Sequence, residues 1–173
     1  PFGFQAFYPG PGVGGHCIAV DPWFIVSATP EHARLIHTAR EVNDGKPEWV
    51  IDKVKVAVAD YLQANPNKTA KDVTIACFGL AFKPDIGDLR ESPALEIARK
   101  LVRMHSGNLL VVEPHIEDIS PSLKGYAQLV SVEEAQERAH IGVILVGHKK
   151  FKEQHASVWN GLAVIDACGM RAA

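Results

Sequence analysis

The sequence predicts an α/β protein in which a long central helix is followed by a Rossmann-like, doubly wound parallel sheet. Short apolar runs rich in branched residues recur through the later part of the chain, with amphipathic stretches between them. A sheet with helices on both faces produces this alternation. Ahead of it, residues 29–65 carry apolar side chains at spacings of three and four, which is the period of a helix with one apolar face.

Each expected strand is a short apolar run. Strands of a parallel sheet are covered on both faces, so their sequences are apolar throughout rather than alternating. Four runs meet this description and a fifth is weaker: residues 73–78, 109–113, 142–146 and 163–166, with the weaker run at 127–130. The stretches 93–104 and 132–139 between them predict helices.

The long helix is expected to start at Thr29. This residue can cap a helix, Pro30 suits the first helical position, and Glu31 places an acid in the first turn. The apolar positions that follow keep one phase: Leu35, Ala39, Val42, Val50, Val54, Ala57 and Tyr61. Such a stripe predicts one continuous apolar face.

The middle of this helix carries two residues that weaken it. Gly45 and Pro47 predict a kink or a break. A helix continuous to Asn65 is ~50 Å long at about 1.5 Å per residue, more than one small domain covers; the alternative is two ordinary antiparallel helices. The chain is thus expected to divide into residues 1–66, with the helix, and 67–173, with the sheet.

Composition excludes several classes of partner. A net charge of -2 leaves no basic surface for nucleic acid or an anionic membrane. The apolar runs are shorter than a membrane span, and we find no signal peptide. Three cysteines form no disulfide framework and suit a reducing compartment, so a cytoplasmic location is expected. The eight histidines show no paired spacing that predicts a metal site.

The stretch 10–24 contains a candidate nucleophile, Cys17, with a carboxylate, Asp21, four residues later. The glycines before Cys17 match the spacing of a dinucleotide-binding turn, but that turn must follow a strand and open a helix. Pro22 argues against a helix here. We therefore expect a loop whose glycines permit close backbone approach. The alternatives are a buried, structural Cys17 and an Asp21 that only shapes a turn.

A second candidate segment, residues 79–91, follows the first expected strand. Ligands of doubly wound sheets bind beyond the carboxyl ends of the strands. The segment carries an aromatic residue and several charges, namely Phe82, Lys83, Asp85, Asp88 and Arg90, and Ser92 and Pro93 then begin a helix. Lys83 can act as a point charge on a phosphate, while Arg90 offers a planar fork. The alternative is a charged loop that is merely solvated.

Two strings give the chain a specific resemblance. P-G-P-G-V-G-G-H-C-I-A-V-D-P-W-F and F-G-L-A-F-K-P-D-I-G-D-L-R-E-S-P resemble the nucleotide-sugar 6-dehydrogenases of the UDP-glucose/GDP-mannose dehydrogenase family, over nearly the whole chain. The resemblance implies a catalytic Cys17 with Asp21, and a loop oriented by its two aspartates. It implies substrate contacts from Tyr8, Gly14, Phe82, Lys83 and Arg171. It also implies that Arg90 contacts the pyrophosphate of NAD.

The same resemblance implies an activity. Family members oxidise the C6 alcohol of a nucleotide sugar to a carboxylate with two NAD, through a thiohemiacetal and a thioester on the cysteine. His16 and the D-P-W-F string resemble the branch that acts on UDP-N-acetylmannosamine in bacterial surface polysaccharide synthesis. Val20 stands where enzymes of UDP-glucose typically have lysine.

The resemblance also implies partners. The NAD-binding domain of the family should precede Pro1, so the chain by itself is not expected to complete the reaction. A homodimer through the central helix is expected. The alternatives are a non-catalytic UDP-sugar-binding and dimerisation module, or a dehydrogenase of UDP-N-acetylglucosamine or UDP-glucose. A cysteine hydrolase would require a histidine held against Cys17.

Overall fold

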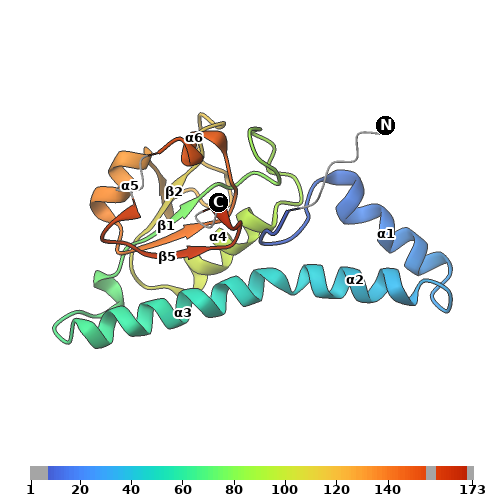
Figure 1. Ribbon diagram of the computed structural model, residues 1–173, viewed down its shortest axis with the longest axis horizontal. Helices are drawn as coiled ribbons and strands as arrows, with labels where there is room; N and C mark the ends of the chain where they lie inside the picture. Colours follow the sequence, from blue (N-terminus) through green and yellow to red (C-terminus); the bar gives the residue numbers. More distant parts are fainter. Residues whose placement is uncertain (1–7, 155–158, 171–173) are drawn as a thin grey trace.

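A five-stranded parallel sheet lies at the centre of the C-terminal part of the chain (Figure 1). The computed structural model describes residues 8–154 and 159–170. The strands run in the order β3-β2-β1-β4-β5, and their bounds are β1 (Ile75–Phe78), β2 (Leu109–Val112), β3 (Ala127–Leu129), β4 (Ile141–Ile144) and β5 (Ala163–Asp166). All neighbours are parallel. The Rossmann-like prediction is confirmed, including the weak run that forms β3.

Helices cover both faces of the sheet. This explains why the central strand β1 is apolar at every position. Its residues Ile75 and Cys77 face a core shared with α3 (Lys46–Ala64) and α4 (Pro93–Met104). Phe78 faces the opposite core, which α5 (Val132–Arg138) and the short α6 (Lys149–Lys152) complete. A single 3-10 turn, Ala70–Asp72, leads from α3 into β1.

The Cys17 segment is helical, so the predicted loop is wrong. Helix α1 (His16–Ala28) contains Pro22 in its interior. Proline has no N–H, so the carbonyl of Ile18, four residues earlier, lacks its helical donor. Arg40 of α2 (Arg34–Asp44) donates from Nη1 to that carbonyl at 3.4 Å. A partner on a neighbouring helix thus replaces the bond that Pro22 removes.

The predicted start of the long helix at Thr29 is also wrong. Thr29 ends α1, since its N–H and its Oγ1 both donate to the carbonyl of Ile25. Residues 30–32 form a turn, and the next helix begins at Arg34. The chain therefore reverses direction between α1 and α2 (Figure 1).

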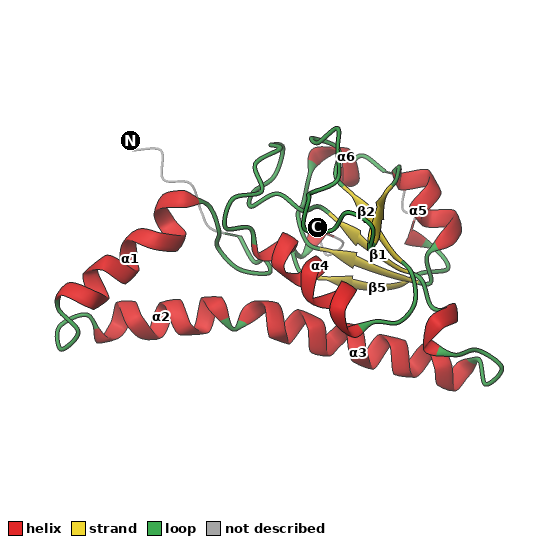
Figure 2. Cartoon of the chain, turned by 180° about the vertical axis from the view of Figure 1, so that it is seen from behind, coloured by secondary structure: helices red, strands yellow, loops and turns green. Residues whose placement is uncertain are grey.

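Helices α2 and α3 lie end to end along one line in both views (Figures 1 and 2). Only Gly45 separates them, and its backbone is close to helical (φ -79, ψ -12). Pro47 sits in the first turn of α3, where its missing N–H costs no helical bond. The break is thus local, and the alternative of two antiparallel helices over 29–65 is wrong.

The apolar stripe of the long helix divides into two halves. Val50 and Val54 are buried against the sheet, with Ala57 and Tyr61 packed beside them. Leu35, Ala39 and Val42 on α2 are exposed. The sheet thus covers the α3 half of the stripe and leaves the α2 half open. Within the described residues, no helix combines the length and apolar character that a membrane span requires.

Candidate functional site

Cys17 and Asp21 lie on the first two turns of α1. A spacing of four residues places two side chains on the same face of a helix, and both residues are exposed. The first N–H groups of a helix have no helical acceptor, so the sulfur lies beside the positive end of α1. The assignment of Cys17 and Asp21 as a catalytic pair stays a prediction, while the local structure is a helix rather than the predicted loop.

His16 lies close to the thiol, although adjacent residues of a helix usually point in different directions. Its Nδ1 is 3.9 Å from Cys17 Sγ. A cysteine hydrolase also requires a group that orients the histidine. No acidic side chain of the described residues is found in hydrogen-bond or ion-pair contact with His16. The contact therefore does not form a hydrolase triad.

The glycine loop before α1, residues 10–15, packs directly against the segment that follows β1, residues 79–93. Gly14 is buried, and a Cβ there would lie 2.2 Å from the carbonyl oxygen of Glu91 and 2.7 Å from Pro93 Cδ. A Cβ on Gly15 would lie 2.8 Å from the ring of Phe82. Only glycine allows these approaches. The glycines therefore bring the start of α1 against the loop that follows β1.

Asn43 of α2 fastens the glycine loop from the other side. Its Oδ1 accepts from the N–H of Val13 at 2.7 Å, and its Nδ2 donates to the Val13 carbonyl at 3.4 Å. The sequence analysis did not single out Asn43. The sequence did offer a signal, because Asn43 is an amide that can both donate and accept, next to the apolar stripe of a predicted helix.

The glycine loop, residues 10–15, opens helix α1, which is one of the two features of a dinucleotide cradle. A Rossmann turn needs a strand before it, and residues 8–15 form none. The candidate substrate residue Tyr8 is 83% exposed. Arg171, the other candidate near a chain end, lies outside the described residues.

The loop after β1 ends in a well-formed helix start. Ser92 Oγ donates to the Leu80 carbonyl at 2.6 Å and accepts from the N–H of Leu95 at 3.3 Å, so it caps α4. Lys83 is exposed, with Nζ 5.6 Å from the centre of the Phe82 ring. Phe82 and Lys83 thus present an aromatic face and a cation beside the start of α1.

Asp88 holds Arg90 in one orientation. The carboxylate accepts from Arg90 Nε, Nη2 and the backbone N–H. These bonds lower the pKa of Asp88 to about 2 and raise the pKa of Arg90 above its usual value, with a small contribution from Cys17. Arg90 therefore lies within electrostatic reach of the thiol.

A cleft of about 620 Å³ separates α1 and α2 from the segment 89–96. Three arginines are among its lining residues: Arg40, Arg90 and Arg99. Ala19, Val20 and Trp23 line it from α1, and this side of the helix is not the side of Cys17 and Asp21. The lining also includes three acids, Asp44, Glu91 and Glu96. The cleft therefore carries charges of both signs, and it is separate from the thiol.

Two residues that the sequence analysis did not select, Glu113 and His148, bind the backbone of the loop 79–91. Glu113 directly follows β2, and His148 follows β4 by a few residues. Both are buried at the edge of the sheet where parallel strands end. Polar residues after apolar runs were the available signal.

The family of the chain follows from comparison with known proteins. The UDP binding domain of the UDP-glucose/GDP-mannose dehydrogenase family matches residues 76–171, and the central domain of the same family matches residues 1–45. The chain belongs to this family. The two matched regions meet at the Gly14–Glu91 and Gly15–Phe82 contacts.

Several relatives share most of the chain. A UDP-N-acetyl-D-mannosamine dehydrogenase of Yersinia pestis is 62% identical over 83% of this chain, and one of Escherichia coli K12 is 57% identical over 94%. The solved UDP-N-acetyl-mannosamine dehydrogenase of Staphylococcus aureus superposes on 98% of this chain with a TM-score of 0.73 and 31% identity. The superposed region is 37% of that structure. The chain spans only 34% and 38% of the lengths of the two curated relatives.

The three thiols should differ in reactivity. Burial raises the pKa of Cys77 and Cys168 to about 12, so both stay protonated at pH ~8, whereas only a thiolate is alkylated. Cys17 is exposed. We expect iodoacetamide to label Cys17 alone in the native chain and all three after unfolding.

Peptide mass spectrometry locates the label. Cys17→Ala is the control and should remain unlabelled while folded. Labelling of Cys77 or Cys168 as fast as Cys17 in the native chain would contradict the assignment of a single accessible thiol.

Proposed function

We propose that this chain is the C-terminal part of an NAD-dependent UDP-N-acetylmannosamine 6-dehydrogenase, with Cys17 as nucleophile and the loop 79–91 as part of the UDP-sugar site. The packing of Gly15 against Phe82 carries the proposal. It sets the candidate nucleophile next to the aromatic and cationic groups that would hold the nucleotide. The identities of 62% and 57% with relatives of that name support the choice of sugar.

In this proposal Phe82 and Lys83 bind the substrate. Lys83 Nζ is exposed and can contact the diphosphate as a point charge. Phe82 lies between Lys83 and Gly15, so a sugar nucleotide that contacts this ring extends toward α1. Tyr8, Gly14 and Arg171 are proposed to complete the substrate site.

Cys17 would form the covalent intermediates. When bound, NAD supplies the hydride acceptor for each of two oxidations at C6 of the sugar. Between them the Cys17 thiolate adds to the aldehyde carbon, which gives a thiohemiacetal with another hydrogen to lose. After the second oxidation, water attacks the resulting thioester, the carbon–sulfur bond breaks, and the thiolate is restored as the acid leaves.

Asp21 would serve the steps that involve water and protons. It lies one helical turn from Cys17, and both side chains are exposed on the same face. It can accept a proton from the attacking water or hold that water in place. The N-terminus of α1 would stabilise negative charge that develops on oxygen at the reacting carbon.

Arg90 is the residue of this chain that fits a contact with NAD. Asp88 engages Nε and Nη2, which fixes the plane of the guanidinium, and Nη1 has no partner among the described residues. A planar fork held in this way suits a pyrophosphate. A domain that binds the rest of the dinucleotide would belong to the longer protein.

Surface polysaccharide synthesis and a cytoplasmic location remain part of this proposal. The product would be a UDP-linked uronic acid, made where nucleotide sugars and NAD are available. An accessible Cys17 and a buried Cys77, both as free thiols, fit a reducing compartment.

Ligand titration and NAD reduction test the function together. We expect UDP to bind the chain in calorimetry, and the complete dehydrogenase to reduce two NAD per UDP-N-acetylmannosamine. UDP-glucose and UDP-N-acetylglucosamine are the matched alternative substrates. UDP binding without any NAD reduction would favour a non-catalytic module, and faster oxidation of either alternative sugar would overturn the choice of substrate.

We propose that a homodimer forms through the central helix, on the α2 half of the stripe. Leu35 and Val42 are 83% and 67% exposed, and Ala39 lies between them on one face. Exposed apolar stripes of this kind mark interaction sites. We expect light scattering to report twice the chain mass, and Leu35→Glu to shift the chain to monomer. Glu41→Gln, on another face of α2, should leave the dimer intact; a monomer in the unsubstituted chain at all concentrations would contradict the proposal.

A further inference from the structure

Glu113 and His148 form a fully buried pair at the carboxyl edge of the sheet. Their side chains have no exposed surface, and His148 Nε2 lies 3.1 Å from Glu113 Oε2. Buried charged groups are costly unless they are paired and hydrogen-bonded. The chain nevertheless places this pair directly behind the loop 79–91.

Both side chains also accept hydrogen bonds from the backbone of that loop, while Glu113 Oε1 accepts from the N–H of His115 at 3.1 Å. Glu113 Oε2 accepts from the N–H groups of Leu80 and Ala81 at 2.7 and 3.1 Å. His148 Nδ1 accepts from the N–H of Asp85 at 2.9 Å. Because Nδ1 is an acceptor, the neutral ring carries its proton on Nε2 and donates it to Glu113. Phe82 and Lys83 lie between these anchored positions.

The loop adopts a conformation that requires such anchors. Asp85 has a φ of 61, in the left-handed region that residues with a side chain rarely occupy. Its backbone N–H is bound to His148, and its Oδ1 accepts from the N–H of Lys149 at 2.8 Å. The bend that presents Lys83 is thus held from both sides by the segment after β4.

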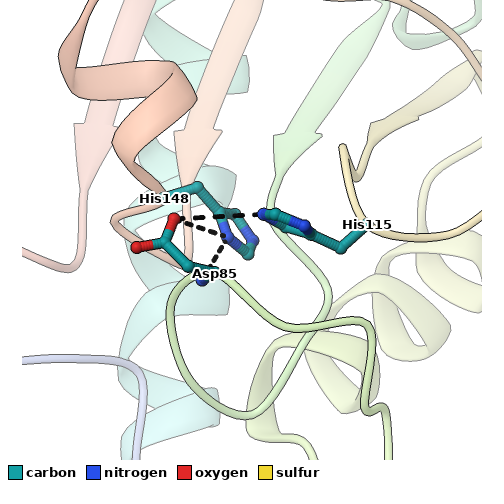
Figure 3. A group of neighbouring side chains, drawn as sticks. All are labelled: Asp85, His115 and His148. Atoms are coloured by element: carbon teal, nitrogen blue, oxygen red, sulfur yellow. Dashed lines mark hydrogen bonds and ion pairs between the residues drawn. The ribbon is translucent and has the colours of Figure 1, made fainter.

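Asp85, His115 and His148 also stand close enough to suggest a metal site (Figure 3). Asp85 Oδ1 lies 3.9 Å from His115 Nε2 and 4.0 Å from His148 Nδ1. The lone pair of His148 Nδ1, however, already accepts the Asp85 N–H. An ion could bind there only by displacing that bond, so the geometry favours a fastening of the loop over a metal centre.

We propose that Glu113 and His148 are positioning residues that hold Phe82 and Lys83 in the conformation that binds the UDP part of the substrate. The proposal rests on the proposed function of the loop 79–91. It assigns the pair no contact with the substrate: Glu113 and His148 act through the backbone that they hold.

Two substitutions of His148 separate its two hydrogen bonds. In His148→Asn the side-chain oxygen stands near the place of Nδ1 and keeps an acceptor for the Asp85 N–H. In His148→Gln the amide nitrogen stands near Nε2 and keeps the donor to Glu113, but the Asp85 N–H loses its acceptor. We expect His148→Gln to weaken UDP binding about tenfold or more, because the loop that carries Lys83 loses one anchor. In His148→Asn the UDP affinity should stay within about threefold of the unsubstituted chain.

Amide hydrogen exchange measured without ligand tests the fastening separately from UDP binding. We expect the Asp85 N–H to lose protection in His148→Gln and to keep it in His148→Asn. His32→Ala is the matched control, because His32 lies on the turn after α1 and contacts Glu31 rather than the loop, and it should change neither quantity. If UDP does not bind the unsubstituted chain, the proposed function fails, while the exchange result still decides the fastening.

Three outcomes would overturn the proposal. The first is unchanged Asp85 protection and UDP affinity in a folded His148→Gln. If that variant does not fold, Glu113→Met replaces it, since a thioether of similar length is only a weak acceptor and leaves Nε2–H without its carboxylate; unchanged protection and affinity there is the second. The third is a Co²⁺ absorption band that appears with the unsubstituted chain and disappears in His115→Ala, because His148 Nδ1 would then be free to ligate.

Discussion

Replacing Cys17 by alanine in the complete dehydrogenase is expected to lower the rate of acid formation at least about a thousandfold, since no covalent route to the acid remains. UDP-sugar affinity should stay within about twofold, because the nucleotide contacts a loop that this change does not touch. The thiol is exposed at the start of α1, so its removal opens no cavity in the core. Uronic acid production is measured by chromatography, and affinity by calorimetry.

Cys168→Ala is the control for the loss of a thiol. Cys168 lies beyond β5, where its Sγ is 3.8 Å from the Ile144 carbonyl and its side chain packs against the core that contains Phe78, so its substitution should leave the rate unchanged. Acid formation by Cys17→Ala at an undiminished rate would show that another group forms the intermediate.

Replacing Lys83 by alanine should weaken UDP binding about ten- to a hundredfold, or ~1.5–3 kcal/mol, the range of a hydrogen bond to a charged group. Replacing Arg90 should leave UDP affinity of the chain nearly unchanged and raise the Michaelis constant for NAD in the complete enzyme. The reason for the difference is geometric. Lys83 lies over Phe82, whereas Asp88 holds Arg90 in place with electrostatic reach to Cys17.

Calorimetry with UDP and steady-state kinetics with NAD distinguish the two roles. Lys71→Ala removes an exposed lysine from the turn before β1, at the opposite edge of the sheet, and should change neither quantity. Equal losses of UDP affinity from Lys83→Ala and Arg90→Ala would place Arg90 in the sugar-nucleotide site and remove its assignment to NAD.

Local patterns were enough for the sheet. The strands β1, β2 and β4 are apolar at nearly every position because both faces are covered. Ser92 and Pro93 begin α4 as expected, because capping depends on a few adjacent residues. Cys17 and Asp21 were predicted on a loop, and only helix α1 places them on one face.

Local patterns failed where a distant group compensates for an unfavourable one. Pro22 argues against a helix when only its neighbours are considered, yet α1 forms because Arg40, on another helix, donates to the carbonyl that Pro22 leaves without a donor. Thr29 and Pro30 have the residue types of a helix start, but Thr29 ends α1 instead. In both cases the packing of α1 against α2 decides the local structure.

The sequence by itself determined the sheet, the family and the identity of the candidate nucleophile, because those depend on burial patterns and on residues close together in the chain. The tertiary structure decided which glycine faces which loop, that Glu113 anchors Leu80 and Ala81, and that His148 anchors Asp85. These contacts join residues 32 to 77 positions apart. Their bonds depend on distances of a few tenths of an ångström, which only the folded arrangement of strands and helices defines.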